Sequence, residues 1–140
     1  QVLSANLDSM FHMTRLVINP MLAKGWGRIV NISSINAQKG QFGQSNYSAA
    51  KAGIHGFTKA LAQEVAAKGV TVNTVSPGYV MTPMVAKIAP EVLAKIAAGI
   101  PVGRLGEPEE IGKAVAYLAS QDCGYVTGSD FSINGGQHMS

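Results

Sequence analysis

The feature that most constrains the fold is an alternation of long helical segments with short runs of β-branched residues. Residues 2–24 and 45–68 carry apolar side chains at helical spacing, and each segment is followed by a glycine that can end a helix. Residues 28–32 and 70–75 are rich in Val, Ile and Thr and are bounded by turn residues, which is typical of buried parallel strands. This alternation predicts an α/β fold with a parallel sheet and right-handed crossovers.

The C-terminal part of the chain continues the alternation less regularly. One or two short helices, interrupted by Pro90, are expected over residues 83–99. A further helix is predicted over residues 108–120, because a proline and two glutamates suit its first turn. A last strand is predicted over residues 129–133. On the long second helix, the expected buried stripe comprises Ile54, Phe57, Leu61 and Val65.

Composition places the chain among globular proteins of single-domain size. Its 140 residues are 46% hydrophobic and 14% charged, and the net charge of +3 is spread over single residues without a basic stripe, which argues against nucleic-acid binding. Its apolar stretches fall well short of the roughly 20 residues of a membrane span. Cys123 is the single cysteine of the sequence and nothing resembles a secretory signal, so we expect a cytoplasmic protein with no membrane role.

Three polar side chains fall where a parallel α/β sheet places its chemistry. Ligands of such sheets lie beyond the carboxyl ends of the strands, and Ser34 follows the strand over residues 28–32. Tyr47 and Lys51 stand four residues apart near the start of the next helix, and therefore on one face. A free phenol ionises only near pH 10, so a tyrosine that donates a proton near neutral pH benefits from an adjacent ammonium. These residues predict proton transfer to a carbonyl oxygen that Ser34 also contacts.

Each of these residues also has a purely structural interpretation. Ser34 could be a turn residue, Tyr47 a packing residue and the Pro77-Gly78 pair an ordinary turn. His12, His55 and His138 are not at zinc-ligand spacing, so no metal site is expected and they are interpreted as surface or interface residues.

The surrounding motifs resemble the short-chain dehydrogenase/reductases. Residues 28–34 read Arg-Ile-Val-Asn-Ile-Ser-Ser, and residues 46–53 read Asn-Tyr-Ser-Ala-Ala-Lys-Ala-Gly. The resemblance extends over residues 1–140 and implies a Rossmann-like doubly wound parallel sheet, of which this chain is the C-terminal, catalytic half of a single domain. The chain starts at Gln1 and contains no Gly-x-Gly-x-x-Gly, so the cofactor-binding half is expected upstream, and the first strand is expected to have a free edge.

The resemblance also implies roles for individual residues in catalysis and in cofactor binding. Asn6 would complete a catalytic tetrad with Ser34, Tyr47 and Lys51 and help to hold a water for proton relay. NADPH, in preference to NADH, would be bound by Tyr47, Lys51, Pro77, Gly78, Val80 and Thr82. Within this set, Lys51 would bind the nicotinamide ribose hydroxyls and Val80 would offer a backbone group to the carboxamide.

Three segments further resemble reductases that act on acetoacetyl-CoA in polyhydroxybutyrate synthesis: residues 41–44, 77–79 and 135–140. The activity implied is NADPH-dependent reduction of acetoacetyl-CoA to (R)-3-hydroxybutyryl-CoA. The residues implied to line the substrate site are Ser34, Gln41, Phe42, Gln44, Gly78 and Tyr79. Two alternatives stay open: a 3-oxoacyl-acyl-carrier-protein reductase, and a non-catalytic dinucleotide-binding protein, which would be expected to lack Tyr47 or Lys51.

The resemblance implies a homotetramer as well. Its main contact would pair the helices over residues 2–24 and 45–68 with those of a second subunit, and a second interface would lie near the C-terminal strand. The small residues Ala49, Ala52 and Gly53 would let the paired helices approach closely.

Overall fold

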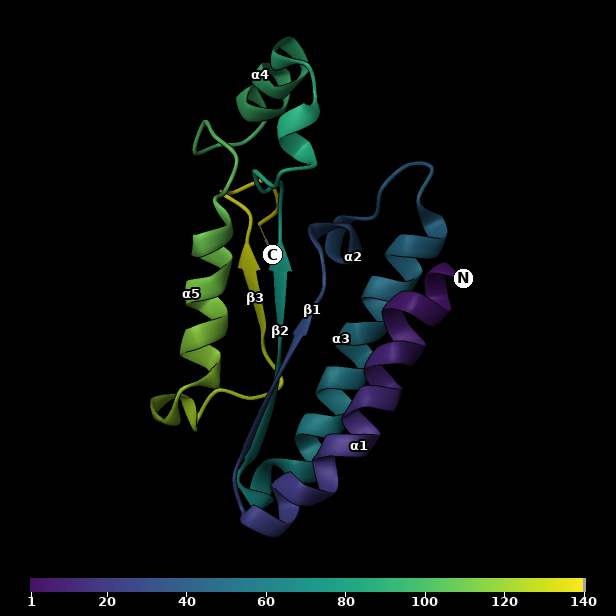
Figure 1. Cartoon of the computed structure of the whole chain (residues 1–140), viewed down its shortest axis with the longest axis vertical. Coiled ribbons are helices and arrows are strands. Elements are labelled where there is room, and N and C mark those ends of the chain that lie inside the picture. Colours follow the sequence, from purple (N-terminus) through teal and green to yellow (C-terminus); the bar gives the residue numbers. More distant parts are fainter. Residues whose placement is uncertain (140) are drawn as a thin grey trace.

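A parallel three-stranded sheet forms the centre of the structure, a computed structural model that describes residues 1–139 (Figure 1). The strands lie in the order β1-β2-β3, and β2 is buried almost throughout. The elements in chain order are a π-helical turn (Ser4–Asp8), α1 (Ser9–Lys24), β1 (Gly27–Ile32), α2 (Ile35–Lys39), α3 (Ser45–Val65), β2 (Val70–Pro77), α4 (Pro90–Ala98), α5 (Pro108–Ala119) and β3 (Asp130–Ile133). Short 3-10 turns cover Ala66–Lys68, Val85–Lys87 and Gln121–Cys123. The predicted α/β fold with a parallel sheet is confirmed; Ser140 lies outside the described residues.

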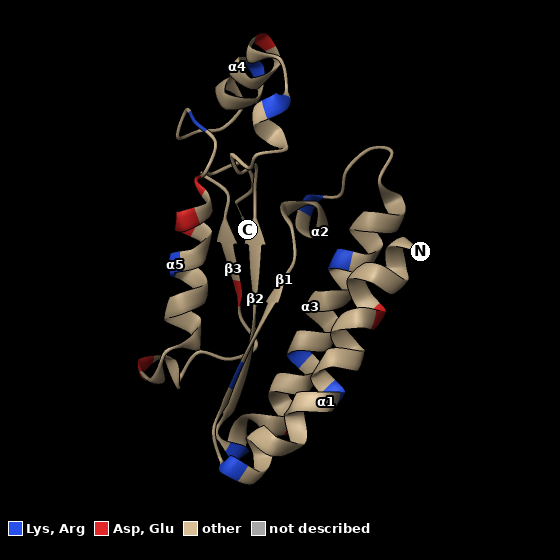
Figure 2. Cartoon of the chain, viewed as in Figure 1, with Lys and Arg blue, Asp and Glu red and all other residues tan. Residues whose placement is uncertain are grey.

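Two helical layers cover the sheet. Helices α1 and α3 lie side by side on one face and α5 covers the other, while α4 stands beyond the carboxyl ends of the strands (Figure 1). The core accordingly has two parts. The buried residues of the first are Ala62, Val65, Val70 and Val72, and those of the second are Val75, Leu118 and Cys123. Figure 2 shows Lys and Arg scattered over the helices and loops without a continuous basic stripe.

The register of the sheet brings the strand ends together. Ile32 of β1 pairs with Val75 of β2, and Pro77 of β2 pairs with Ile133 of β3. Because all three strands are parallel, the residues that follow them lie together beyond the carboxyl ends of the sheet. On the side away from β2, β1 has no strand partner among residues 1–139, and Ile32 is 45% exposed.

The predicted helix ends at residues 25 and 69 are correct. Gly25 and Gly69 both adopt the left-handed conformation, with φ of 68° and 79°, which glycine reaches without steric cost. The predicted single helix over residues 2–24 instead begins with a π-helical turn, and the segment over residues 45–68 ends in a 3-10 turn.

The sequence prediction was wrong at two points of the fold. Helix α2 was not predicted, because five residues are too few to show helical periodicity. The expected buried stripe of α3 was also partly wrong. Ile54 and Val65 are buried, but the helix faces the sheet mainly with small residues such as Ala50 and Ala62. Phe57 turns toward α1, where its ring lies 6.1 Å from that of Phe11.

The start of α5 is held by an ion pair with a pH-dependent contribution to stability. Arg104 donates two hydrogen bonds of 2.8 Å to the Glu110 carboxylate, which also accepts from the Glu107 backbone amide. The hydrogen bonds from Arg104 are the main cause that lowers the pKa of Glu110 from 4.5 to about 2. The folded-state pKa lies below the ordinary one, so this carboxylate stabilises the fold above pH 4.5, and the contribution is lost as pH falls toward 2.

We therefore expect Glu110→Gln to lower the melting temperature at pH 7. The deficit relative to the unsubstituted protein should shrink as pH falls from 4.5 to 2, because protonation removes the same interaction there. Thermal unfolding followed by circular dichroism across pH 2–7 measures it. Glu109→Gln, on the same helical turn, is the control and should leave the pH dependence unchanged. A deficit that stays constant over the whole range would contradict the assignment.

Candidate active site

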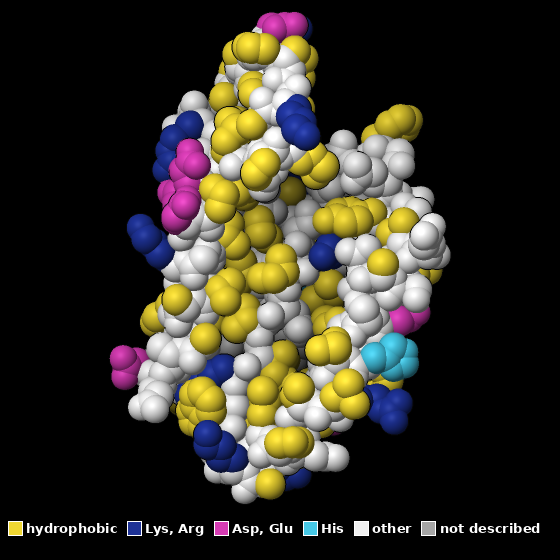
Figure 3. All heavy atoms as spheres, viewed as in Figure 1, with side chains coloured by type: hydrophobic (Ala, Val, Ile, Leu, Met, Phe, Trp, Pro, Cys, Tyr) yellow, Lys and Arg dark blue, Asp and Glu magenta, His cyan; other side chains and the backbone are white. Residues whose placement is uncertain are grey.

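A cleft of about 590 Å³ lies beyond the carboxyl ends of β1 and β2. In Figure 3 the surface is hollowed below α4, between α5 and the side formed by α2 and α3. The predicted site residues that line the cleft are Ser34, Tyr47, Pro77, Gly78, Tyr79, Val80 and Thr82. Its apolar wall includes Met84, Val85 and Ile111, which sequence reasoning did not single out.

Ser34 is both a helix cap and a free hydrogen-bond donor. It directly follows β1 in extended conformation and is the N-cap of α2, where its hydroxyl oxygen accepts from the Asn36 amide at 3.1 Å. A hydroxyl that accepts in this way still has its own proton to donate. Ser34 can therefore polarise an oxygen bound in the cleft.

Tyr47 and Lys51 lie on one face of α3, as the spacing predicted. The Lys51 ammonium is 5.7 Å from the centroid of the Tyr47 ring and donates a hydrogen bond of 2.9 Å to the carbonyl of Ile32, at the end of β1. Partial burial lowers the pKa of Lys51. The same burial removes water that would screen the ammonium, which strengthens its effect on the phenol. The arrangement places the Tyr47 ring beside a cation.

The segment after β2 presents donors to the cleft. The Gly78 amide donates to Ile133, and a bridge between residues 80 and 106 uses the Met81 amide and the Tyr79 carbonyl. The Val80 amide takes no part in this bridge. The Thr82 hydroxyl accepts from the Val85 amide at 3.3 Å and keeps its proton for another acceptor.

A second cavity of about 200 Å³ adjoins the cleft and contains most of the predicted substrate residues. Its lining includes Gln41 and Gln44 and shares Ser34, Gly78 and Tyr79 with the cleft. The Gln44 side-chain oxygen accepts from Asn36 at 3.1 Å, which leaves its amide hydrogens to bind a ligand.

Three predicted residues line neither of these cavities. Lys51 is one of them, and it lies beside the Tyr47 ring. Phe42 is fully exposed and lines neither cavity. Asn6 lies on the π-helical turn that precedes α1, where its side-chain amide donates to the Val2 carbonyl at 3.0 Å. Asn6 is likewise absent from the lining of both cavities.

Sequence reasoning missed a polar cluster directly behind the cleft. His55, interpreted as a surface or interface residue, is largely buried and contacts hydroxyls of Ser33 and Ser76. Its spacing could have revealed it, because His55 stands four residues after Lys51 and eight after Tyr47, on the same face of α3. Among residues 1–139, no cluster of three or more His, Cys, Asp or Glu could hold a metal ion.

Comparisons with known proteins identify relatives along almost the whole chain. A family model described as Enoyl-(Acyl carrier protein) reductase matches residues 1–138. The chain is 65% identical to acetoacetyl-CoA reductase of Cupriavidus necator and 58% identical to acetoacetyl-CoA reductase of Rhizobium meliloti, covering 99% of this chain and 56% and 58% of those proteins. It is 48% identical to 3-oxoacyl-[acyl-carrier-protein] reductase of Haemophilus influenzae, with coverage of 99% and 57%. The chain thus spans a little over half the length of these curated relatives.

The tight packing of Gly78 leads to a testable prediction. A Cβ atom at this position would lie 2.8 Å from Asn134 Cβ and 2.9 Å from Asn134 Cα, so backbone would have to move. We expect Gly78→Ala to destabilise the fold by about 1–3 kcal/mol, measured by urea unfolding. Gly112→Ala, at an exposed position within α5 with nothing within 4 Å, is the matched control and should stabilise the fold by up to about 1 kcal/mol. Equal effects of the two substitutions would show that the Asn134 contact is unimportant.

Proposed function

Because the chain belongs to the reductase family of that model, the short-chain dehydrogenase/reductases, we propose that its protein reduces acetoacetyl-CoA with NADPH to (R)-3-hydroxybutyryl-CoA. The observation that carries this proposal is geometric. The Ser34 hydroxyl and the Tyr47 phenol line one cleft, and the Lys51 ammonium lies beside the Tyr47 ring. The choice of substrate is supported by the relatives, since those named acetoacetyl-CoA reductase are more similar to this chain than those named for the acyl-carrier-protein substrate.

The donor set around the cleft fits the nicotinamide end of NADPH. A carboxamide needs a backbone donor, which the Val80 amide offers, and a nearby phosphate or amide oxygen can accept from the Thr82 hydroxyl. The Pro77 and Gly78 backbone would form the floor of this site, and Tyr47 and Lys51 would contact the ribose hydroxyls. When bound, NADPH supplies a hydride to the substrate carbonyl carbon.

The chain's own residues perform the proton transfer. The Ser34 hydroxyl donates to the carbonyl oxygen and polarises it, and the Tyr47 phenol gives that oxygen its proton as the alcohol forms. The Lys51 ammonium stabilises the phenolate that remains, and its hydrogen bond to Ile32 holds it in place. Asn6 is proposed to hold the water that returns a proton through Lys51; with its amide group engaged by Val2, the side-chain oxygen is the atom available for this.

The second cavity is proposed to hold the thioester and the adjoining part of the pantetheine arm. The amides of Gln41 and Gln44 suit the polar groups of such a chain, and Tyr79 gives an apolar wall. Phe42 is fully exposed between Gly40 and Gly43, which both have positive φ. A contact of Phe42 with substrate therefore requires this loop to fold toward the cavity.

We also propose that the protein acts as a homotetramer in the cytoplasm. Met13 and Leu16 on α1 are exposed at 62% and 72%, and a contact between subunits would cover them. Ala49 and Ala52 of α3 are exposed as well, but Gly53 already packs against Leu7 of the same chain.

A buried, unpaired Cys123 suits a reducing compartment. No helix within residues 1–139 is long and apolar enough to cross a membrane.

Replacing the phenol tests the proton-transfer role. In the full polypeptide that carries this chain, Tyr47→Phe should lower kcat for acetoacetyl-CoA at least about 10²-fold, because the proton donor is lost while the ring remains. The Kd for NADPH, measured by fluorescence, should change less than about threefold. Tyr117→Phe, at a half-exposed position on α5, is the control and should leave kcat unchanged. Retained turnover in Tyr47→Phe would remove this residue from the acid role.

A comparison of two thioesters tests the substrate. We expect kcat/KM for acetoacetyl-CoA to exceed that for acetoacetyl-acyl carrier protein by at least about tenfold, which corresponds to roughly 1.4 kcal/mol of transition-state affinity. The assay follows NADPH absorbance with each thioester over a range of concentrations. A tenfold preference for the carrier-protein thioester would instead assign the protein to fatty-acid synthesis. Binding of NADPH without turnover of either thioester would favour the non-catalytic alternative.

A further inference from the structure

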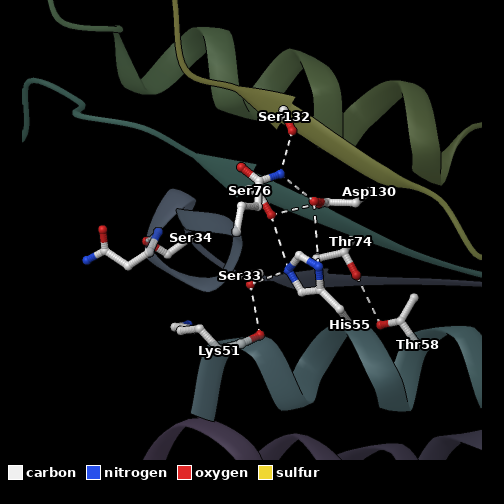
Figure 4. A network of polar contacts seen from close by, with 11 residues as sticks. Ser33, Ser34, Lys51, His55, Thr58, Thr74, Ser76, Asp130 and Ser132 are labelled. Atoms are coloured by element: carbon white, nitrogen blue, oxygen red, sulfur yellow. Dashed lines mark hydrogen bonds and ion pairs between the residues drawn. The ribbon is translucent and has the colours of Figure 1, made fainter. Parts of the chain in front are cut away.

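Five polar side chains behind the cleft form one hydrogen-bonded group, which we call the polar clamp: Ser33, Gln38, His55, Ser76 and Asp130. Figure 4 shows the His55 ring directed from α3 toward the sheet, between Ser33, Ser76 and Asp130. The residues come from α2, α3, β2, β3 and the end of β1. Ser33 and Ser76 are buried, and the side chains of His55 and Asp130 are 18% and 20% exposed.

The contacts define which atom donates each proton. The Ser33 hydroxyl donates to the Lys51 carbonyl at 3.1 Å, and the Ser76 hydroxyl donates to Asp130 at 2.7 Å. Both hydroxyl protons are therefore committed, so the contact of 2.7 Å between His55 Nε2 and Ser33 Oγ must be donated by the histidine.

This assignment argues against a hydrolytic Ser-His-Asp triad. In such a triad the histidine Nε2 accepts the serine proton, which is the reverse of the direction found here. His55 Nδ1 also stands 3.7 Å from the Asp130 carboxylate, beyond hydrogen-bond distance. The clamp is arranged to hold groups in place, not to activate a nucleophile.

Two links run from the clamp to the catalytic residues. The first passes from His55 through the Ser33 hydroxyl to the backbone carbonyl of Lys51, and so joins α3 to the strand end that carries Ser34. The second passes from Asp130 to Gln38, which donates to the carboxylate at 2.7 Å and belongs to α2, the helix that Ser34 caps. Asp130 thus contacts α2 directly through Gln38 and reaches His55 of α3 through the Ser76 hydroxyl.

We propose that His55 and Asp130 are positioning residues for the reduction, an inference that rests on the proposed function. They act through Ser33 and Gln38 and set where the Lys51 ammonium and the Tyr47 phenol lie relative to Ser34. A loosened clamp lets α3 shift against the strand end, so that the ammonium stabilises the phenolate less well. Small displacements of this kind reduce turnover strongly because proton transfer depends on near-contact geometry.

The structure offers a matched control one turn further along α3. Thr58 is buried and also joins the helix to the sheet, through hydrogen bonds of 2.9 Å from Asn31 and 3.1 Å from Thr74. Among residues 1–139, no side-chain hydrogen bond joins Thr58 to Lys51 or Ser33. Thr58→Val therefore removes a helix–sheet anchor of similar kind without touching the links to the catalytic residues.

The test measures kcat, KM and pH profiles in the full polypeptide. His55→Leu should lower kcat for acetoacetyl-CoA at least about tenfold with little change in KM for NADPH. In the reverse oxidation of 3-hydroxybutyryl-CoA, the acid limb of the profile should move up by about half a pH unit or more, because the phenolate is less stabilised. His55→Gln, which keeps an N–H donor within reach of Ser33, should recover kcat to within about threefold. Thr58→Val should lower the melting temperature but leave kcat and the pH profile unchanged.

Other outcomes overturn the inference. If His55→Leu keeps both kcat and the pH profile, or if Thr58→Val changes them equally, the clamp is structural only. If His55→Leu does not fold, Asp130→Asn carries the test: it keeps the shape of the side chain and should still shift the acid limb, and an unchanged profile rejects the proposal.

If the unsubstituted protein turns over only the carrier-protein thioester, the proposed substrate fails while the clamp is tested on that thioester. If it turns over neither thioester, the proposed function and the clamp fall together.

Discussion

The packing of α3 onto β2 is the constraint on which the site depends. The helix buries small side chains such as Ala50 and Ala62 at this contact, which let it lie close to the sheet. A larger side chain at any of these positions would push the helix outward and carry Tyr47 and Lys51 away from the strand ends. The placement of Tyr47 and Lys51 therefore depends on residues that line neither cavity.

Much of the architecture follows from short-range sequence signals. Gly25 and Gly69 mark helix ends because only glycine enters the left-handed conformation at little cost, and both adopt it. The positions of Ser34 and Pro77 follow from where β-branched runs stop, since a parallel sheet gathers its carboxyl ends at one edge. Helix α2 escaped prediction because its main signal is a single capping serine, which also reads as a turn residue.

The missed features depend on contacts between distant parts of the sequence. His55 and Asp130 are 75 residues apart, and only the strand order places β3 where its carboxylate faces α3. The small residues of α3 illustrate the same point: Gly53 packs against Leu7 of the same chain, a contact that the size of the residue alone did not indicate. Composition and spacing show which residues share a face of a helix, but the tertiary fold determines which distant residues that face contacts.

The Gly78-Tyr79 dipeptide belongs to the cleft and to the adjoining cavity at once. Gly78 is wedged against Asn134, and a Cβ there would also meet the Gln137 side chain, which itself binds the Tyr79 amide at 3.0 Å. If the proposed dinucleotide and thioester lie on either side of this dipeptide, a movement that suits one ligand displaces a wall of the other, so the two would not bind independently. Their affinities are then linked by a shared free energy, and whichever ligand binds first raises or lowers the affinity for the second by the same factor in either order.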